Sequence, residues 1–302
     1  MKKLYLILGS IVITAVLAIF LFFFFSHTQL EKLGPDDLKR LNVDFDTSMN
    51  LAAHPHRLDS PMERKFYETF KSMYEKNNLS KVTWSEKLLV PKIIHQIWLG
   101  SAFPDKYRAY QASWKKYNPD WEYRLWTEAE LKDFPMQNRD LYENAKNYGE
   151  KSDIARYEIL YQLGGLYVDT DYECIRPFDL FNHCYDFYIG IQPLDTSIVQ
   201  LGIGLIGAAP GHPLLKVALD SLRAQSQQTE QIIAKTGPVF FTQVFVMVAP
   251  YLGDKTVAFP PTYFYPRGYT QSEKDTAQWL KPESFAVHQW EGSWMKKEAF
   301  VK

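Results

Sequence analysis

The segment 152–173, SDIARYEILYQLGGLYVDTDYE, constrains the fold more than any other part of the chain. Apolar side chains recur along Ile159–Leu163 at a spacing typical of a helix that packs on a sheet. The Gly164–Gly165 pair would end this helix, because glycine readily adopts the left-handed conformation of a C-cap. The apolar run Leu166–Val168 then predicts a short buried strand. A helix, a glycine break and a buried strand together indicate one unit of an α/β sheet.

Asp169 and Asp171 follow this strand directly. In extended chain, residues i and i+2 point to the same side, so we expect the two carboxylates to lie close together. At ~5 Å and an effective dielectric of ~20 they would repel by about 3 kcal/mol, which a divalent cation removes. Mg²⁺ and Mn²⁺ prefer oxygen ligands, and acids at the carboxyl end of a strand lie where open α/β sheets bind ligands. We therefore predict a Mn²⁺ or Mg²⁺ site for the diphosphate of a nucleotide sugar. A solvated turn is the alternative, and it describes most isolated D-x-D sequences.

Asp153 and Arg156 lie three positions apart on the predicted helix and therefore share a face. We expect them to bind sugar hydroxyls or to orient the two acids. The alternative is a surface ion pair worth a few tenths of a kcal/mol. Tyr167 is a candidate for the pocket lining, although a tyrosine in a strand lies in the core as often.

The segment resembles the sugar-binding region of the DXD glycosyltransferases. This family includes the yeast-type α-1,6-mannosyltransferases and the inositol-phosphoceramide mannosyltransferases, and the clostridial glucosylating toxins are more distant relatives. Three further stretches fit it in family order: 91–100 (PKIIHQIWLG), 118–127 (NPDWEYRLWT) and 288–294 (HQWEGSW). The resemblance implies a GT-A-like α/β fold, with a Rossmann-type, mostly parallel sheet and helices on both faces.

The resemblance also implies an activity. Such an enzyme would transfer a hexose from GDP-mannose, UDP-galactose or UDP-glucose to a glycan, lipid or protein acceptor, with retention of anomeric configuration. Two other classes stay open: a membrane-anchored nucleotide-sugar hydrolase that uses the same metal site, and a catalytically silent carbohydrate-binding protein.

The C-terminal stretch supplies further candidates. Asp171 is the first choice of metal ligand, and Asp169 would touch the donor ribose, the sugar or the metal. His288 ends a predicted strand and would complete the coordination shell or bind a phosphate, unless it is a buried strand histidine. The family pattern implies that Ser293 and Trp294 close over the diphosphate, with Gly292 as the hinge of the loop.

The first predicted strand, 93–98, offers Gln96 and Trp98 for the region that binds the nucleotide base. His95 and Ile97 would face the opposite way, and we expect His95 to be a core histidine with its hydrogen bonds satisfied. Stretches typical of strands alternate with stretches typical of helices along the rest of the chain. Thr127 and Glu130 predict a capping box at the start of a short helix. Further strands are expected at 121–126, 187–192, 201–208, 256–259 and 284–288, and helices at 61–77, 104–117, 140–148, 152–163, 212–224 and 236–251.

Gly202, Gly204 and Gly207 spell G-x-G-x-x-G, the spacing of a dinucleotide-binding turn. That turn must open a helix, whereas the sequence 209–213 that follows here breaks one. The glycines therefore indicate a strand that something approaches closely.

The N-terminus predicts a membrane anchor. The uncharged run 4–25 would span about 33 Å as a helix, enough for a bilayer core of ~30 Å, and no typical cleavage site follows it. We expect a cytosolic tail and signal anchor at 1–28, a stem with helical segments at 29–90 and the catalytic domain at 91–302; a cleaved signal peptide is the alternative. The family resemblance implies a type II protein with a lumenal, Golgi-like domain in a eukaryote, and we expect an inner-membrane protein with a cytoplasmic domain in a bacterium. The sequon at Asn78 is compatible with the lumenal location.

The composition argues against nucleic acid as a partner of the protein. The net charge is −1, without the basic excess that nucleic-acid binding requires. Cys174 and Cys184 are the only cysteines, and they allow either one small disulfide loop or two buried free thiols.

Overall fold

The computed structural model describes residues 33–196, 198–271 and 276–295, without the side chains of Thr276, Ala277 and Trp294. The predicted anchor, residues 1–28, lies outside the described residues. Leu33–Lys302 forms one compact unit, so the residues expected to form a stem pack onto the domain that follows them.

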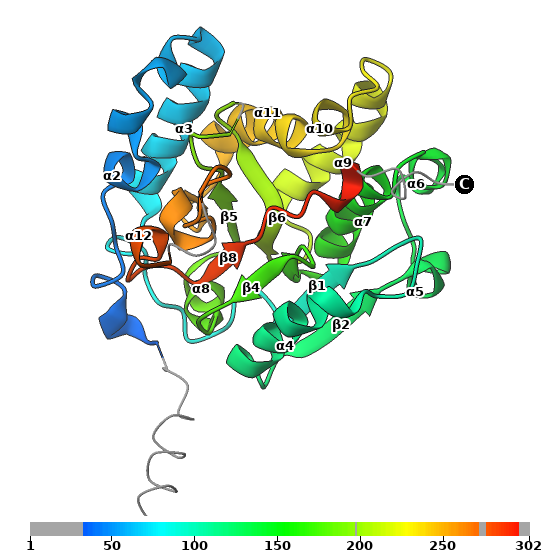
Figure 1. Ribbon diagram of the computed structural model, residues 1–302, viewed down its shortest axis with the longest axis horizontal. Helices are drawn as coiled ribbons and strands as arrows, with labels where there is room; N and C mark the ends of the chain where they lie inside the picture. Colours follow the sequence, from blue (N-terminus) through cyan, green and yellow to red (C-terminus); the bar gives the residue numbers. More distant parts are fainter. Residues whose placement is uncertain (1–32, 197, 272–275, 296–302) are drawn as a thin grey trace, which may run out of the picture. The chain divides into compact units, whose positions relative to one another are not determined.

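A six-stranded sheet in the order β2-β1-β3-β6-β5-β7 forms the centre of this unit (Figure 1). Five strands run in one direction, and β6 is antiparallel to both of its neighbours. The prediction of a mostly parallel sheet is therefore confirmed. The strands are β1 (Ile93–Ile97), β2 (Glu122–Trp126), β3 (Gly165–Val168), β5 (Phe187–Ile191), β6 (Leu201–Ala208) and β7 (Thr256–Phe259).

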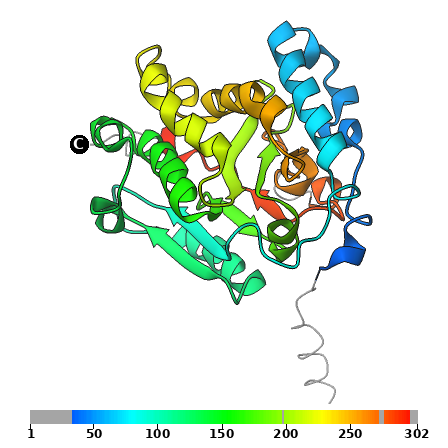
Figure 2. The same cartoon turned by 180° about the vertical axis from the view of Figure 1, so that it is seen from behind.

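Helices cover both faces of the sheet, as Figures 1 and 2 show from opposite sides. Helices α7 (Tyr148–Leu163), α9 (Pro213–Ser226) and α11 (Pro238–Val248) pack together on one face. On the other face α4 (Arg108–Tyr117) packs on a ribbon of β4 (Tyr172–Cys174) and β8 (Ala286–His288). The remaining helices are α2 (Phe45–Met49), α3 (Pro61–Asn77), α5 (Glu128–Lys132), α6 (Arg139–Asn144), α8 (Asp179–Cys184), α10 (Ile232–Lys235) and α12 (Thr276–Trp279), with 3₁₀ turns η1 (Pro35–Asp37), η2 (Leu51–Ala53), η3 (Pro55–Leu58), η4 (Asp105–Tyr107), η5 (Ala249–Tyr251), η6 (Pro261–Tyr263) and η7 (Ser293–Met295).

The turn between α7 and β3 explains how this part of the sequence folds. Gly164 and Gly165 both have positive φ, at 63° and 103°. A Cβ at Gly165 would lie 2.7 Å from the carbonyl oxygen of Ile93 on β1, so only glycine lets the strands approach here. The carbonyl oxygen of Gly164 accepts a hydrogen bond of 2.9 Å from Nε2 of His95. The glycine break thus places β3 directly against β1.

His95 is the satisfied core histidine that the sequence predicts. It is fully buried, and its Nδ1 accepts a hydrogen bond of 3.1 Å from Nε1 of Trp126. Burial lowers the pKa of His95 to about 4, so the imidazole is neutral at pH 7. Its role is to hold β1, β2 and the α7–β3 turn together.

The three glycines of the G-x-G-x-x-G sequence lie in β6, which confirms the strand and excludes the helix opening that dinucleotide binding would need. A Cβ would collide with Tyr265 at Gly202 and with Tyr188 at Gly207. At Gly204 it would lie 2.7 Å from Oδ2 of Asp169. The glycines therefore admit two core aromatic rings and one candidate site acid.

Among the elements that escape the sequence patterns, β4 and α8 matter most for the cysteines. Strand β4 has only three residues, and its sole partner in the described part is the distant β8, with Tyr172 opposite His288. Cys174 and Cys184 lie in these elements as buried free thiols, so the disulfide alternative is wrong. Burial raises the pKa of both thiols, that of Cys184 to about 12.

Residues 33–90 are an integral part of the fold. Helix α3 packs on β7 and α11, and the rings of Phe70 and Phe245 lie 5.9 Å apart. The sequon residue Asn78 is buried, and its Oδ1 accepts hydrogen bonds from the backbone and side chain of Ser80. The sequon is therefore inaccessible in the folded chain and does not support a lumenal location.

The described residues contain one segment that is long and apolar enough to cross a membrane, Ile232–Tyr251. It comprises α10, α11 and η5, and α11 packs on β6, α9 and α3. More than half of its apolar window, 56%, is buried inside the protein, as expected for a core helix.

We predict that Gly207→Ala destabilises the protein by about 1–3 kcal/mol, because the methyl group would overpack the buried ring of Tyr188. Gly253→Ala is the matched control, since a Cβ there meets no atom within 4 Å. Chemical unfolding monitored by tryptophan fluorescence would measure both variants. Equal stability of the two would contradict this account of β6.

Candidate functional site

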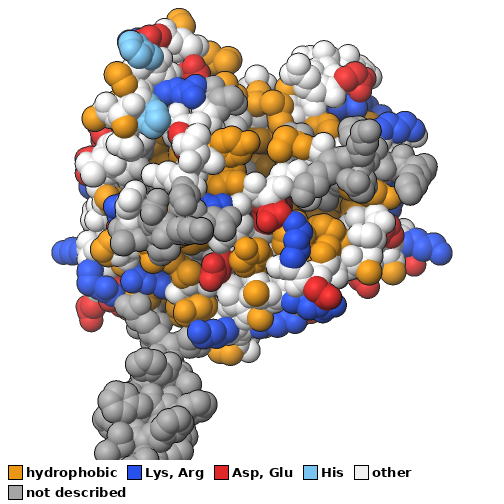
Figure 3. Space-filling model, in the orientation of Figure 1, with side chains coloured by type: hydrophobic (Ala, Val, Ile, Leu, Met, Phe, Trp, Pro, Cys, Tyr) orange, Lys and Arg blue, Asp and Glu red, His pale blue; other side chains and the backbone are white. Residues whose placement is uncertain are grey.

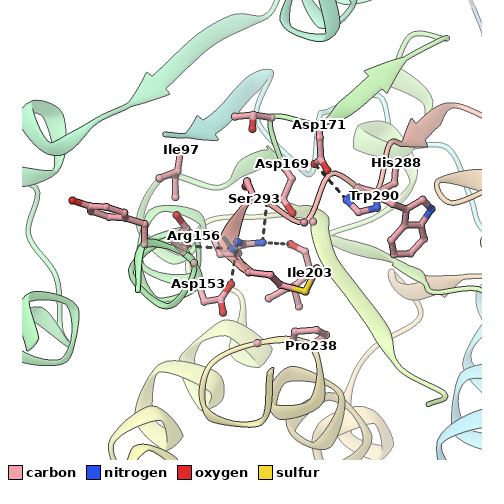
Figure 4. A pocket seen from close by; sticks show the side chains of 18 of the residues that line it. Ile97, Asp153, Arg156, Asp169, Asp171, Ile203, Pro238, His288, Trp290 and Ser293 are labelled. Atoms are coloured by element: carbon pink, nitrogen blue, oxygen red, sulfur yellow. Dashed lines mark hydrogen bonds and ion pairs between the residues drawn. The ribbon is translucent and has the colours of Figure 1, made fainter. Parts of the chain in front are cut away.

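A cavity of about 1020 Å³ opens at the edge of the sheet where β1 and β3 end. The face drawn in Figure 3 is hollowed, and hydrophobic side chains gather in the hollow. Figure 4 shows that Asp153 approaches this space from α7, and Asp169 and Asp171 from the turn that follows β3. The size suits a ligand with several rings and charged groups.

Asp169 and Asp171 converge, as the sequence predicts, but not through extended chain. Strand β3 ends at Val168, and the chain then turns, with the N–H of Tyr172 donating to the carbonyl oxygen of Asp169 at 3.1 Å. The turn leads into β4, which pairs with β8 and places His288 beside the acids. Nε2 of His288 lies 3.4 Å from Oδ1 of Asp171. One ligand atom from each of Asp169, Asp171 and His288 lies within 4.8 Å of the others.

The charge of Asp171 is supported from two sides. Burial alone would raise its pKa, but the charge and hydrogen bond of His288 and the backbone N–H of Glu291 outweigh this and lower the pKa. That N–H donates to Oδ2 of Asp171 at 3.0 Å. Asp171 is therefore an oriented, ionised carboxylate.

Asp169 is oriented by the strand beneath it. The hydroxyl of Tyr167 donates to Oδ1 of Asp169 at 2.7 Å, and Nη1 of Arg156 lies 3.2 Å from the same oxygen. Tyr167 itself is buried, and its side chain lines the floor of the cavity. Both Tyr167 alternatives thus apply, since the residue belongs to the core and to the lining.

Arg156 binds two acids at once. Its guanidinium lies 3.0 Å from Oδ1 of Asp153, pairs with Asp169, and donates to the carbonyl oxygen of Ile203 at 2.8 Å (Figure 4). The guanidinium carbon also lies 4.4 Å from the centre of the Tyr167 ring. Only 6% of the Arg156 side chain and 8% of that of Asp153 are exposed, so the surface ion-pair alternative is wrong.

Asp153 depends on a residue that the sequence patterns do not reveal. The hydroxyl of Thr236 donates to Oδ2 of Asp153 at 2.9 Å. Burial raises the pKa of the Asp153 carboxyl to about 7, against the opposing charge of Arg156. Thr236 precedes the Gly237-Pro238 start of α11, where sequence spacing gives no sign of a contact with α7.

Gln96 and Trp98, the two residues predicted for the nucleotide-base region, lie in different environments. Trp98 lines the cavity together with Ile97, which the alternation of a strand would have pointed away. The strand ends at Ile97, so the alternation of its side chains does not extend to Trp98. Gln96 is fully buried and does not line the cavity. Its Nε2 donates to the carbonyl oxygen of Asp169 at 3.2 Å, and its Oε1 accepts from Tyr123, so Gln96 supports the turn instead of facing a ligand.

The segment after β8 covers one side of the acids. Trp290 and Gly292 both have φ of 56°, so the backbone bends sharply here. Nε1 of Trp290 donates to the carbonyl oxygen of Arg267 at 3.0 Å, and its ring packs against His288 with centroids 4.4 Å apart. Ser293 lines the cavity, whereas the side chain of Trp294 lies outside the description. Trp290 belongs to the HQWEGSW stretch, but the sequence alone does not predict which residues its ring would contact.

A divalent cation fits this donor set. Oδ1 of Asp169 and Oδ2 of Asp171 are held by protein hydrogen bonds, and a cation bound between Oδ1 of Asp171 and Nε2 of His288 would replace their contact of 3.4 Å. Nδ1 of His288 is buried without a hydrogen-bond partner among the described residues. Carboxylate oxygens suit Mg²⁺ and Mn²⁺, and outer hydrogen bonds of this kind orient metal ligands. The residues therefore fit the predicted ion.

Comparison with known families bears on this geometry. Residues 104–188 match the family described as "Glycosyltransferase sugar-binding region containing DXD motif". The family predicted for this region is confirmed. The match contains Asp153, Arg156, Asp169 and Asp171 of the candidate site, whereas His288 lies beyond it.

Two named yeast enzymes are similar to about half of this chain. The inositol phosphoceramide mannosyltransferase 3 of Schizosaccharomyces pombe is 30% identical over 53% of this chain and 46% of its own. The mannosyl phosphorylinositol ceramide synthase SUR1 of Saccharomyces cerevisiae is 30% identical over 52% of this chain and 42% of its own. The matched region thus spans about half the length of these relatives. Among solved structures, the PaToxG glycosyltransferase is 18% identical, covers 62% of this chain and 79% of its own, and has a TM-score of 0.44.

We predict that Arg156→Leu lowers the free energy of unfolding by about 3–5 kcal/mol, because it leaves two acids without their buried partner. The control is Arg223→Leu, which removes an exposed pair with Asp140 and should cost no more than about 1 kcal/mol. Urea unfolding at pH 8 would compare them. Equal losses would show that the Arg156 cluster contributes no more than a surface pair.

Proposed function

We propose that the protein is a metal-dependent glycosyltransferase that transfers a hexose from a nucleotide sugar to a hydroxylated acceptor. The observation that carries this proposal is the convergence of Asp169, Asp171 and His288 at one end of a large cavity. The family match of the region that holds both acids supports it. The sheet, with β6 alone reversed, is compatible with the GT-A-like organisation implied by the resemblance.

Asp169, Asp171 and His288 would hold Mn²⁺ or Mg²⁺. The ion would neutralise the diphosphate leaving group as a Lewis acid. Trp98, whose ring contacts that of Tyr107 at 5.3 Å, offers an aromatic surface to the nucleotide base at the β1 end of the cavity. Ser293 would close on the diphosphate from the opposite side, and Gly292 would be the hinge of that movement.

Arg156 and Asp153 are best described as positioning residues. Arg156 already pairs with Asp153 and Asp169 and donates to the carbonyl oxygen of Ile203. Asp153 also accepts a hydrogen bond from Thr236. Their contacts within the protein leave little capacity for a ligand, so we favour orientation of the acids over binding of sugar hydroxyls. They would fix the orientation of Asp169 toward the anomeric carbon of the donor.

The acids that line the described cavity are Asp153, Asp169 and Asp171, and each is held by a protein partner. We infer that none of them acts as a covalent nucleophile or as a base on the far side of the sugar, because Arg156 and the proposed metal would engage their oxygens. This supports transfer with retention, in which the acceptor hydroxyl attacks from the side that the diphosphate leaves.

One relative is named an inositol phosphoceramide mannosyltransferase and the other a mannosyl phosphorylinositol ceramide synthase. We therefore rank GDP-mannose ahead of UDP-galactose and UDP-glucose as the donor, and a lipid ahead of a glycan or protein as the acceptor. We also propose that residues 1–28 anchor the enzyme as a single-pass membrane protein, type II in a eukaryotic cell or held at the inner membrane of a bacterium. Hydrolysis of the nucleotide sugar is the second candidate, with water in place of the acceptor at the same site.

We predict that Asp171→Asn abolishes turnover of GDP-mannose in the presence of Mn²⁺, with a loss of at least about 100-fold, because it removes an oriented charge at the reacting diphosphate. Release of GDP and the sugar product would be measured together by mass spectrometry, with and without EDTA. Free mannose as the sole product would favour the hydrolase.

Asp220→Asn is the matched control, because Asp220 is an exposed residue of α9 that pairs only with surface groups. It should retain full activity. Turnover by Asp171→Asn at the rate of the control would reject the proposed site.

A further inference from the structure

The cavity continues beyond the acids to the connection between β5 and β6. Gln192 follows β5 and Gln200 precedes β6, so both lie at the edge of the sheet that carries Asp169. Nε2 of Gln200 donates to Oε1 of Gln192 at 2.7 Å, and the N–H of Gln192 donates to the carbonyl oxygen of Gln200 at 3.0 Å. Both side chains line the cavity. They form an amide pair that the donor half of the site does not use.

Gln200 has unused hydrogen-bonding capacity that points to a ligand. The residue is 7% exposed, and its Oε1 is fully buried and has no partner among the described residues. A buried acceptor without a donor is unfavourable, so such groups need an explanation. The oxygen itself is closed off from the cavity, so a ligand hydroxyl would supply the missing donor once the Gln200 amide turns toward the cavity that the residue lines.

Aromatic rings face the same end of the cavity. Trp290 and Tyr269 both line it, and their rings lie 5.6 Å apart and perpendicular. The N–H of Tyr269 donates to Oδ1 of Asp195 at 3.1 Å, and Asp195 belongs to the β5–β6 connection. This contact ties the aromatic rings to the segment that carries the amide pair.

The connection is held from the N-terminal part of the chain. Nε of Arg57 donates to the carbonyl oxygen of Leu194 at 2.8 Å, and Oε1 of Glu63 accepts from the N–H of Val199 at 3.0 Å. The amide pair therefore sits on a fixed support, and binding need not order it first.

Charge restricts the ligand. The basic residues that line the described cavity are Lys106 and Arg156, and both are committed, Lys106 to Glu291 and Arg156 to two acids. At the amide end the lining is neutral, with Gln192, Thr196 and Gln200 beside the aromatic rings. Amides and hydroxyls match ring hydroxyls, and the aromatic faces match the C–H groups of a ring.

We propose that Gln192, Gln200, Tyr269 and Trp290 form the acceptor subsite, and that it binds an uncharged, polyhydroxylated ring. The inference rests on the proposed glycosyltransferase function, which it deepens by naming the residues and the chemistry of acceptor recognition. Gln200 would position the ring, and one of its hydroxyls would then face the donor sugar held near Asp169.

Saturation-transfer NMR on the full chain would test the subsite with methyl α-D-mannopyranoside, methyl β-D-glucopyranoside and glucose 6-phosphate as probes. The expected result is saturation of the two methyl glycosides and weaker saturation of the phosphate ester. Gln200→Leu should reduce the glycoside signals by about fivefold or more, the loss expected for one hydrogen bond in a closed site. Gln192→Leu should act in the same direction, and it keeps the test decisive if Gln200→Leu does not fold.

Gln228→Leu is the matched control, because Gln228 is exposed just beyond α9 and does not line the cavity. Thermal shift with Mn²⁺ and GDP or UDP would be measured on the same samples. Retained nucleotide binding without glycoside saturation, equal signals in Gln200→Leu and control, or stronger saturation of the phosphate ester would each overturn the subsite. Loss of nucleotide binding in the wild-type chain would instead reject the proposed function.

Discussion

The guanidinium of Arg156 holds two acids of the site in place, and the rest of the arrangement depends on it. Placing a carboxylate in a buried position is costly unless an opposite charge and further hydrogen bonds compensate. Arg156 compensates Asp153 and Asp169 together, and the carbonyl oxygen of Ile203 and the ring of Tyr167 fix its plane. Because Ile203 lies in β6 and Tyr167 in β3, these contacts of Arg156 also help to hold the antiparallel strand β6 beside β3.

The charge balance of the site then points to a cation. Three carboxylates, Asp153, Asp169 and Asp171, face one guanidinium, so the cluster carries a net charge of about −2 when His288 is neutral and all the acids are ionised. A divalent ion at Asp169, Asp171 and His288 would cancel that charge. The same ion would attract a diphosphate, whose own charge needs a counter-ion. The proposed binding of a metal-bound diphosphate would relieve this excess negative charge, which is complete above the pKa of Asp153, about 7, where that carboxyl is ionised.

Local patterns in the sequence were sufficient for much of this. The glycine break, the buried strand and the two acids are consecutive in the chain, and their arrangement follows from backbone geometry that neighbouring residues determine. The strand at 201–208 was predictable for the same reason, because the residues after its glycines cannot open a helix. The capping box of Thr127 and Glu130 was predicted and is present.

What the sequence could not supply depends on distant contacts. Among the described residues the three-residue β4 pairs with β8, and the contact between Thr236 and Asp153 joins α7 to the turn between α10 and α11, 83 positions further along the chain. Gln96 was predicted to face a ligand, but strand alternation does not reveal that its side chain packs under the turn at Asp169 and hydrogen-bonds its carbonyl oxygen. The amide pair of Gln192 and Gln200 carries no motif, and it emerges only when the β5–β6 connection is folded against the edge of the sheet.

The central claim is that Asp169, Asp171 and His288 bind a divalent cation that holds the diphosphate of the donor. Anomalous diffraction at the manganese edge, from crystals grown with Mn²⁺ and GDP or UDP, would test it most directly. The account predicts one strong peak in contact with all three side chains and with the diphosphate oxygens. A peak at another place in the cavity, or none at saturating Mn²⁺ with the nucleotide bound, would contradict it.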